Sequence, residues 1–130
     1  MRITTKSKYG LRAVYYLKQN KDKGPISLST LVKDLHLSQN YLEQIFIRLK
    51  QAKIIDSKRG KYGGYYLARE ADQITVGELI RVLEGNDDDY IDVCSDPHNC
   101  NSIDCITLKV FQKMDHAIHS VIDNMTLADF

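Results

Sequence analysis

Apolar residues recur at helical spacing along most of this chain, in stretches separated by short polar segments. Residues 7–19 bring Leu11, Val14 and Tyr15 to one side, which predicts a helix there. Residues 20–25 end in glycine and proline, which interrupt regular structure, and they predict a loop. A first helix and a loop therefore precede a more distinctive pair of elements.

Two short helices should follow, joined by a tight turn at His36 and Leu37. Ser27 and Ser38 are suitable N-caps for the two helices. The apolar residues repeat every three or four positions: Leu28, Leu31, Val32 and Leu35 in the first helix, and Leu42, Ile45, Phe46 and Leu49 in the second. Two amphipathic helices joined so closely predict a helix-turn-helix.

The outer face of the second helix is rich in amides and charges: Gln39, Asn40, Glu43, Gln44, Arg48 and Gln51. Asparagine and glutamine suit adenine edges in the major groove, glutamate suits the cytosine amine, and arginine suits guanine or phosphate. An ordinary amphipathic helix with a solvated side shows the same pattern. This face alone leaves DNA binding and simple solvation equally open.

A β-hairpin is predicted directly after the helix pair. Residues 54–58 and 64–68 are typical of two short strands, and the tip between them carries Arg59, Gly60 and Lys61. An arginine at such a tip can enter a narrow minor groove, and glycine allows the backbone to approach closely. An isolated hairpin could be purely structural, but after this helix pair it predicts a winged helix that binds DNA.

Two further helices complete the pattern. Thr75 and Glu78 have the spacing of a capping box, and the helix that they begin should bury Val76, Leu79, Ile80 and Leu83 and end at Gly85. The last helix should run from about Asp104 to about Asn124. Its apolar seam is Phe111, Met114, Ile118, Val121 and Met125, widened by Val110, Ala117 and Ile122. This surface predicts pairing with a second copy, and the alternative is a core helix within one chain.

The predicted fold is therefore mainly α with a small β-hairpin wing. It comprises a winged helix-turn-helix DNA-binding domain over residues 1–85 and a cysteine-containing sensor loop over residues 86–103. A dimerisation helix and tail occupy residues 104–130.

Charge is unevenly distributed although the 130 residues carry a net charge of only +1. Residues 1–70 hold 15 Lys and Arg against 5 Asp and Glu, whereas residues 71–130 hold 3 against 12. The basic half predicts a polyanion partner, here double-stranded DNA, although solvated helix faces would give a similar imbalance.

No apolar run suits a membrane span or a signal peptide, so we expect a cytoplasmic protein without membrane contact. No nucleophile–base pair or phosphate loop is evident, and we expect no enzyme.

All three cysteines lie in one short polar segment, at Cys94, Cys100 and Cys105. Cytoplasmic thiols stay reduced, so clustered cysteines there more often indicate metal binding or redox sensing than disulfides. Three convergent thiols can hold a metal or an iron–sulfur cluster, or react with oxidants. The segment is therefore a candidate sensor.

Together these motifs resemble the IscR/NsrR/CymR-type family of bacterial winged-helix transcriptional regulators. The resemblance covers almost the whole chain and rests on residues 1–12, 37–49, 59–65, 74–78 and 125–129 together with the three cysteines. It implies a homodimer whose long C-terminal helices cross, with a cluster in each protomer, usually 2Fe–2S and sometimes 4Fe–4S. It also implies DNA-binding and cluster-binding residues: Ser38, Asn40, Tyr41, Glu43 and Gln44 in the major groove, Arg59 and Gly60 at the wing, and Cys94, Cys100 and Cys105 as cluster ligands.

The chain departs from this family at the fourth cluster ligand. Leu108 stands where one family pattern has a histidine, and Lys8 where another has an acidic residue. His98 is a candidate substitute. Other candidate donors are the carboxylates of Asp92, Asp96 and Asp104, and a water or small thiol that completes a 4Fe–4S site. Zinc would accept three cysteines and one histidine, and the chain could also keep its cysteines without a cluster. His116 and His119 are expected to be solvated.

The leading hypothesis is a homodimeric regulator whose affinity for a palindromic operator depends on a cluster at the three cysteines. One alternative keeps DNA binding but replaces the cluster with a zinc or thiol-redox sensor. Another alternative is a winged-helix module that docks a protein or binds a metal.

Overall fold

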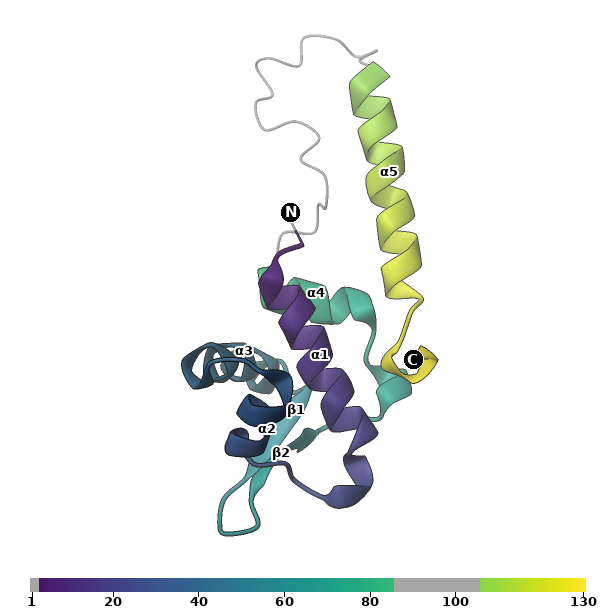
Figure 1. Ribbon diagram of the computed structural model, residues 1–130. Helices are drawn as coiled ribbons and strands as arrows, with labels where there is room; N and C mark the ends of the chain where they lie inside the picture. Colours follow the sequence, from purple (N-terminus) through teal and green to yellow (C-terminus); the bar gives the residue numbers. More distant parts are fainter. Residues whose placement is uncertain (1–2, 86–105) are drawn as a thin grey trace.

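This computed structural model describes residues 3–85 and 106–130 (Figure 1). Each of its first three helices is preceded by a residue whose side chain caps the helix N-terminus. The helices are α1 (Thr5–Gln19), α2 (Leu28–Leu35) and α3 (Gln39–Gln51). The hydroxyls of Thr4, Ser27 and Ser38 accept hydrogen bonds from backbone amides of the following first turns, which otherwise lack partners. The predicted helix-turn-helix is confirmed, and the loop before it contains a short 3₁₀ turn, η1 (Lys21–Lys23).

The predicted hairpin consists of the antiparallel strands β1 (Ile55–Lys58) and β2 (Gly64–Leu67). Its second strand is tied to the segment that enters α2, because Ile26 and Tyr65 exchange backbone hydrogen bonds of 2.9 and 2.8 Å. This approach requires glycine at position 64, where φ is +155° and an added Cβ would lie 2.3 Å from the Ile26 carbonyl. The wing is thus anchored at its base, with its tip extending beyond the helices (Figure 1).

The core lies where α1, α2, α3 and the hairpin meet. The four predicted apolar residues of α3 are buried, as are Leu31 and Leu35 of α2, whereas Leu28 and Val32 lie half-buried at the edge. The rings of Phe46 and Tyr65 are 4.6 Å apart, so the core joins α3 directly to β2. This packing fixes the wing relative to α3.

Helix α4 (Val76–Glu84) lies across one end of α1 and ends at Gly85, as predicted (Figure 1). Thr75 accepts a hydrogen bond of 3.1 Å from the Glu78 amide. The predicted capping box goes no further, because the Glu78 carboxylate forms an ion pair with Arg69, which follows β2. Glu78 therefore links α4 to the hairpin.

Helix α5 (Ile106–Asp123) contacts α4 through its C-terminal turns and otherwise rises away from the other helices (Figure 1). Ile118, Ile122 and Met125 pack against Val76 and Ile80 of α4. Four large apolar residues of α5 are exposed: Ile106, Val110, Met114 and Val121. The predicted seam is thus shared between two environments, because Ile118 and Met125 lie against α4 of the same chain whereas Met114 and Val121 are exposed.

The chain after α5 returns to the core. Thr126 pairs with Thr75, the Leu127 amide donates to the Ile74 carbonyl at 3.0 Å, and Leu127 is 2% exposed. The short 3₁₀ helices η2 (Ala71–Gln73) and η3 (Leu127–Asp129) lie side by side there. Within residues 3–85 and 106–130, no helix is both long and apolar enough to cross a membrane.

Candidate nucleic-acid interface and its connections

The exposed side of α3 carries most of the polar residues predicted to face a major groove. Asn40 and Gln44 are exposed, and their amides offer the donor–acceptor pairs that suit adenine. Ser38 is exposed at the start of the helix, where its hydroxyl already caps the Tyr41 amide at 3.2 Å. Glu43 is half-buried and accepts a hydrogen bond of 3.2 Å from Gln39.

Tyr41 joins α3 to α1. Its ring meets the Tyr9 ring edge-on, with centroids 5.9 Å apart, and its hydroxyl donates to Thr5 at 3.5 Å. Tyr41 is consequently half-buried. Among the predicted groove residues, it differs from the exposed Asn40 and Gln44 in having an intramolecular packing role of its own.

The tip of the wing is exposed and basic. Arg59 and Gly60 are exposed, and Gly60 has φ of +115° with no atom near the position of an added Cβ. Lys58 and Lys61 flank them and are also exposed. Near the wing base, Lys50 of α3 donates to Ser57 at 2.6 Å. The surface formed by α3 and the wing therefore combines amides with cations, as a DNA-binding surface requires.

Arg48 shares this side of α3 in the sequence pattern, but its guanidinium reaches toward α4. Its Nη1 atom donates to the Leu83 carbonyl at 2.9 Å. The helical periodicity predicts only that Arg48 lies opposite the apolar stripe. It does not reveal a contact with a backbone carbonyl far along the chain.

Most of the predicted cluster site lies outside the described residues. This holds for Cys94, Cys100, Cys105 and His98, and for the carboxylate candidates Asp92, Asp96 and Asp104. Of the two departures from the family pattern, Lys8 is exposed on α1 and Leu108 is half-buried in the first turn of α5. Within the part of the chain that the structure describes, no group of three or more His, Cys, Asp or Glu is placed to hold a metal.

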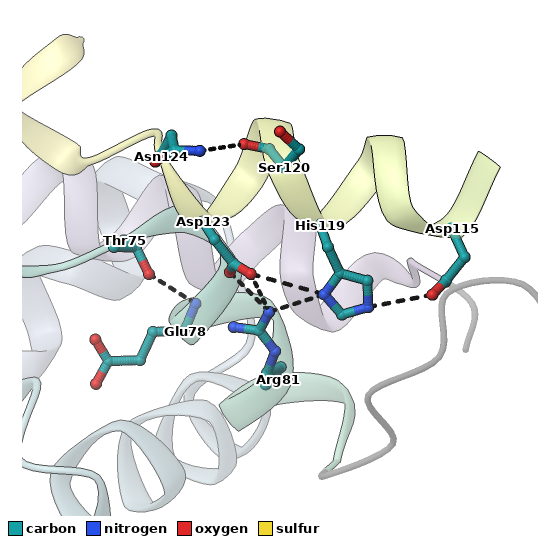
Figure 2. Close-up of polar contacts among 8 residues, drawn as sticks. All are labelled: Thr75, Glu78, Arg81, Asp115, His119, Ser120, Asp123 and Asn124. Atoms are coloured by element: carbon teal, nitrogen blue, oxygen red, sulfur yellow. Dashed lines mark hydrogen bonds and ion pairs between the residues drawn. The ribbon is translucent and has the colours of Figure 1, made fainter. Parts of the chain in front are cut away.

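A polar cluster joins α4 to α5, as Figure 2 shows. Nη2 of Arg81 lies 2.7 Å from both carboxylate oxygens of Asp123 and 3.1 Å from Nδ1 of His119. Nε2 of His119 is 3.4 Å from Asp115. Gly77 gives Asp123 space, because an added Cβ would lie 2.0 Å from its Oδ1 atom. The prediction that His119 is solvated is therefore wrong, whereas His116 is exposed.

The other end of α4 is fixed to the start of α1 through Glu84. Its carboxylate accepts hydrogen bonds from the Thr4 amide and the Ser7 hydroxyl, both at 2.7 Å, and from the Thr4 hydroxyl at 2.8 Å. A carboxylate in the last turn of α4 opposes the dipole of its own helix but favours the N-terminus of α1. Partial burial by itself raises the pKa of Glu84, and the hydrogen bonds from Ser7 and Thr4 outweigh it, so the pKa is lowered from 4.5.

Glu84→Gln should reduce the free energy of unfolding at pH 7 by about 1–2 kcal/mol, because a charged acceptor is lost. The lowered pKa means that the folded state binds fewer protons than the unfolded state. The contribution of Glu84 is therefore complete above its unfolded pKa and disappears as pH falls through the lower folded pKa. Urea unfolding between pH 7 and pH 3 should show wild type and variant converging in acid.

Glu70→Gln is the matched control, because the exposed Glu70 pairs with the exposed Lys21. Water screens an exposed pair of this kind, so Glu70→Gln should change the stability less than Glu84→Gln at pH 7. A constant difference between wild type and Glu84→Gln at every pH would contradict the assigned role of the ionised carboxylate.

Comparison with known proteins identifies relatives that match almost the whole chain. Residues 3–130 match the Rrf2 family model, described as an iron-dependent transcriptional regulator. The transcriptional regulator IscR of Sodalis glossinidius is 33% identical over 132 residues, covering 99% of this chain and 78% of that protein. The structure of T. potens IscR has a TM-score of 0.80 at 37% identity and covers 99% of this chain and 85% of that one. The global cysteine regulator CymR of B. subtilis has a TM-score of 0.81 at 35% identity, covering 99% and 95%.

Proposed function

Because the chain belongs to the Rrf2 family of transcriptional regulators, we propose that it is a homodimer whose affinity for a palindromic operator depends on an iron–sulfur cluster. The resemblance to the IscR/NsrR/CymR-type family and the mainly helical winged-helix fold are both confirmed. The relatives are named as transcriptional regulators rather than enzymes. The observation that carries the DNA-binding proposal is the exposed amide-rich side of α3 beside the basic wing tip.

The proposed DNA contacts divide by chemistry. Asn40 and Gln44 read base edges in the major groove, with Ser38, Tyr41 and Glu43 beside them on the same part of α3. Arg59 enters the adjacent minor groove, where Gly60 lets the backbone approach. Phosphate contacts from the exposed lysines supply affinity without sequence preference.

The proposed dimer rests on surfaces that one chain leaves uncovered. Val110 and Met114 of α5 are 46% and 48% exposed, which is costly for apolar side chains in water. An apolar groove of about 690 Å³ opens near the C-terminal end of α5, lined by Leu11, Arg12, Tyr15, Val76, Met125, Leu127 and Phe130. A second copy could cover both surfaces, and two wings and two α3 helices would then face two half-sites about one DNA turn apart.

The proposed cluster would be held by Cys94, Cys100 and Cys105. Three thiolates suit an iron–sulfur cluster, with His98, a water or a small thiol as the fourth ligand; 2Fe–2S is favoured and 4Fe–4S is the alternative. Lys8 is an exposed cation 5.7 Å from the Tyr9 ring, and Leu108 has no donor atom, so neither can serve as the fourth cluster ligand. Such a cluster supplies a bond network that oxidants or iron shortage can break. In the sequence the cysteines lie between α4 and α5. Ligation there would therefore alter the angle between the two winged helices of the dimer, which are its DNA-reading heads.

The test is DNA binding by anaerobically purified protein, with iron, sulfide and zinc quantified per chain. We expect bound iron and sulfide, and an affinity for promoter DNA that changes when Cys94, Cys100 and Cys105 are all replaced by alanine. Titration over salt should show the steep loss of affinity that phosphate contacts produce. Equal affinity of wild type and the triple variant for every promoter would eliminate the cluster switch.

A second candidate keeps the regulator but changes the sensor. Its basis is the similarity to CymR, which is named a global cysteine regulator. In that case the cysteines bind zinc or are oxidised directly. A colourless protein with one zinc per chain, or a metal-free protein that responds to thiol oxidants, would favour this candidate over the cluster.

A further inference from the structure

The last turn of α4 contacts both α1 and α3 at the point where the chain continues toward the cysteines. The Leu83 carbonyl accepts the hydrogen bond from Arg48, while the Leu83 side chain packs against Gly10 of α1. An added Cβ at Gly10 would lie 2.2 Å from Leu83 Cδ1. The next residue, Glu84, holds Thr4 and Ser7. In Figure 1 this end of α4 lies beside the start of α1 and next to α3.

Arg48 supplies a partner that α4 lacks. The last four carbonyls of a helix accept no hydrogen bond from within the helix, and the helix dipole favours a cation at this end. Arg48 also follows Gln44 by four residues, so both side chains lie on the same side of α3. Arg48, which binds α4, is thus a neighbour of Gln44, which is proposed to read a base.

An open pocket lies beside this contact, next to Gln44 of α3. Its volume is about 370 Å³, and Lys6, Gln44, Arg48 and Leu83 are among the residues that line it. Leu83 is also buried in the same apolar core as Ile45 and Leu49 of α3. The guanidinium–carbonyl hydrogen bond therefore adds a directional contact to the apolar packing between the two helices.

We propose that Arg48 is a positioning residue that transmits the state of the cysteine segment to the DNA-reading helix. The proposal rests on the proposed function and deepens it. A change beyond Gly85 displaces the last turn of α4, and Arg48 moves α3 with the Leu83 carbonyl. Glu84 attaches the same turn to the start of α1, so a displacement of this turn acts on α1 and α3 together.

The experiment compares two DNA affinities for each variant under anaerobic conditions. The first belongs to protein with intact cysteines, and the second to the same protein with all three cysteines replaced by alanine. Their ratio measures the coupling between the cysteine segment and DNA. Arg48→Met, which keeps the apolar stem, should move this ratio toward one by roughly 2- to 30-fold. Iron and sulfide per chain must match those of wild type.

Lys50→Met is the matched control, because it removes one positive charge from the same last turn of α3 while its partner is Ser57 of the wing. Its ratio should equal that of wild type. A simple phosphate contact at Arg48 would instead weaken both affinities equally, preserve the ratio, and lower the salt slope by about 0.9. That result would overturn the proposal.

Glu84→Gln provides an independent variant in case Arg48→Met does not fold, since Glu84 holds the same turn from the α1 side. It should also move the ratio toward one. A ratio that survives both substitutions overturns the coupling while leaving the cluster switch intact. A ratio of one already in wild type overturns the switch and the coupling with it.

Discussion

Gly64→Ala should lower the free energy of unfolding by at least about 3 kcal/mol, because the added methyl group would overlap the backbone. The added Cβ would lie 2.3 Å from both the carbonyl carbon and oxygen of Ile26. These are backbone atoms, so no side-chain rotation relieves the overlap. The hydrogen bonds between Ile26 and Tyr65 must break, and the wing loses its attachment to the segment before α2. Urea unfolding measures the stability loss, and DNA affinity should fall with it.

Gly24→Ala separates the overlap from backbone strain. Gly24 also has positive φ, +76°, but no atom lies within 4 Å of an added Cβ. With ψ of −164°, the backbone at Gly24 lies in a region that essentially only glycine adopts, so strain alone should cost about 1–3 kcal/mol. Equal losses for the two variants would show that the contact with Ile26 has little importance for the wing.

Met114→Glu should weaken dimerisation by at least about 100-fold, because the proposed symmetric interface would bury the new charge twice. Met114 is 48% exposed in a single chain, so the protomer should fold normally. The operator affinity should fall steeply, since one DNA-reading head contacts only one half-site. Sedimentation equilibrium over a range of protein concentrations measures the dimer constant.

Gln112→Glu adds the same charge to the same helix at an exposed position outside the stripe of Ile106, Val110, Met114 and Val121. It should leave the dimer constant within a few-fold of wild type. If Met114→Glu associated as tightly as wild type, the exposed stripe would not be the dimer surface.

The backbone of the winged helix could be predicted because its signals are local. Ser27 and Ser38 lie directly before the helices that they cap, and the apolar stripe of α3 is contained in one short stretch. Gly85 likewise marks the end of α4 where predicted. Each signal involves residues a few positions apart, so the sequence carries both partners together.

The contacts between elements could not be predicted in the same way. Arg48 binds a backbone carbonyl, which every residue has, and Glu84 binds Ser7 at a separation of 77 residues. Periodicity likewise identifies the apolar residues of α5 without showing which side packs on α4. The helices and the wing that carry the candidate DNA surface could therefore be predicted from the sequence, whereas the connections that hold them in place required the structure.

The return of the chain after α5 also constrains how the protein can be made. Leu127 completes the core of the winged helix although it follows α5 in the chain. During translation the head therefore cannot close until α5 has left the ribosome. The DNA-reading surface and the helix proposed to bring two copies together should consequently mature at the same moment, which limits the lifetime of a finished head that lacks its means of pairing.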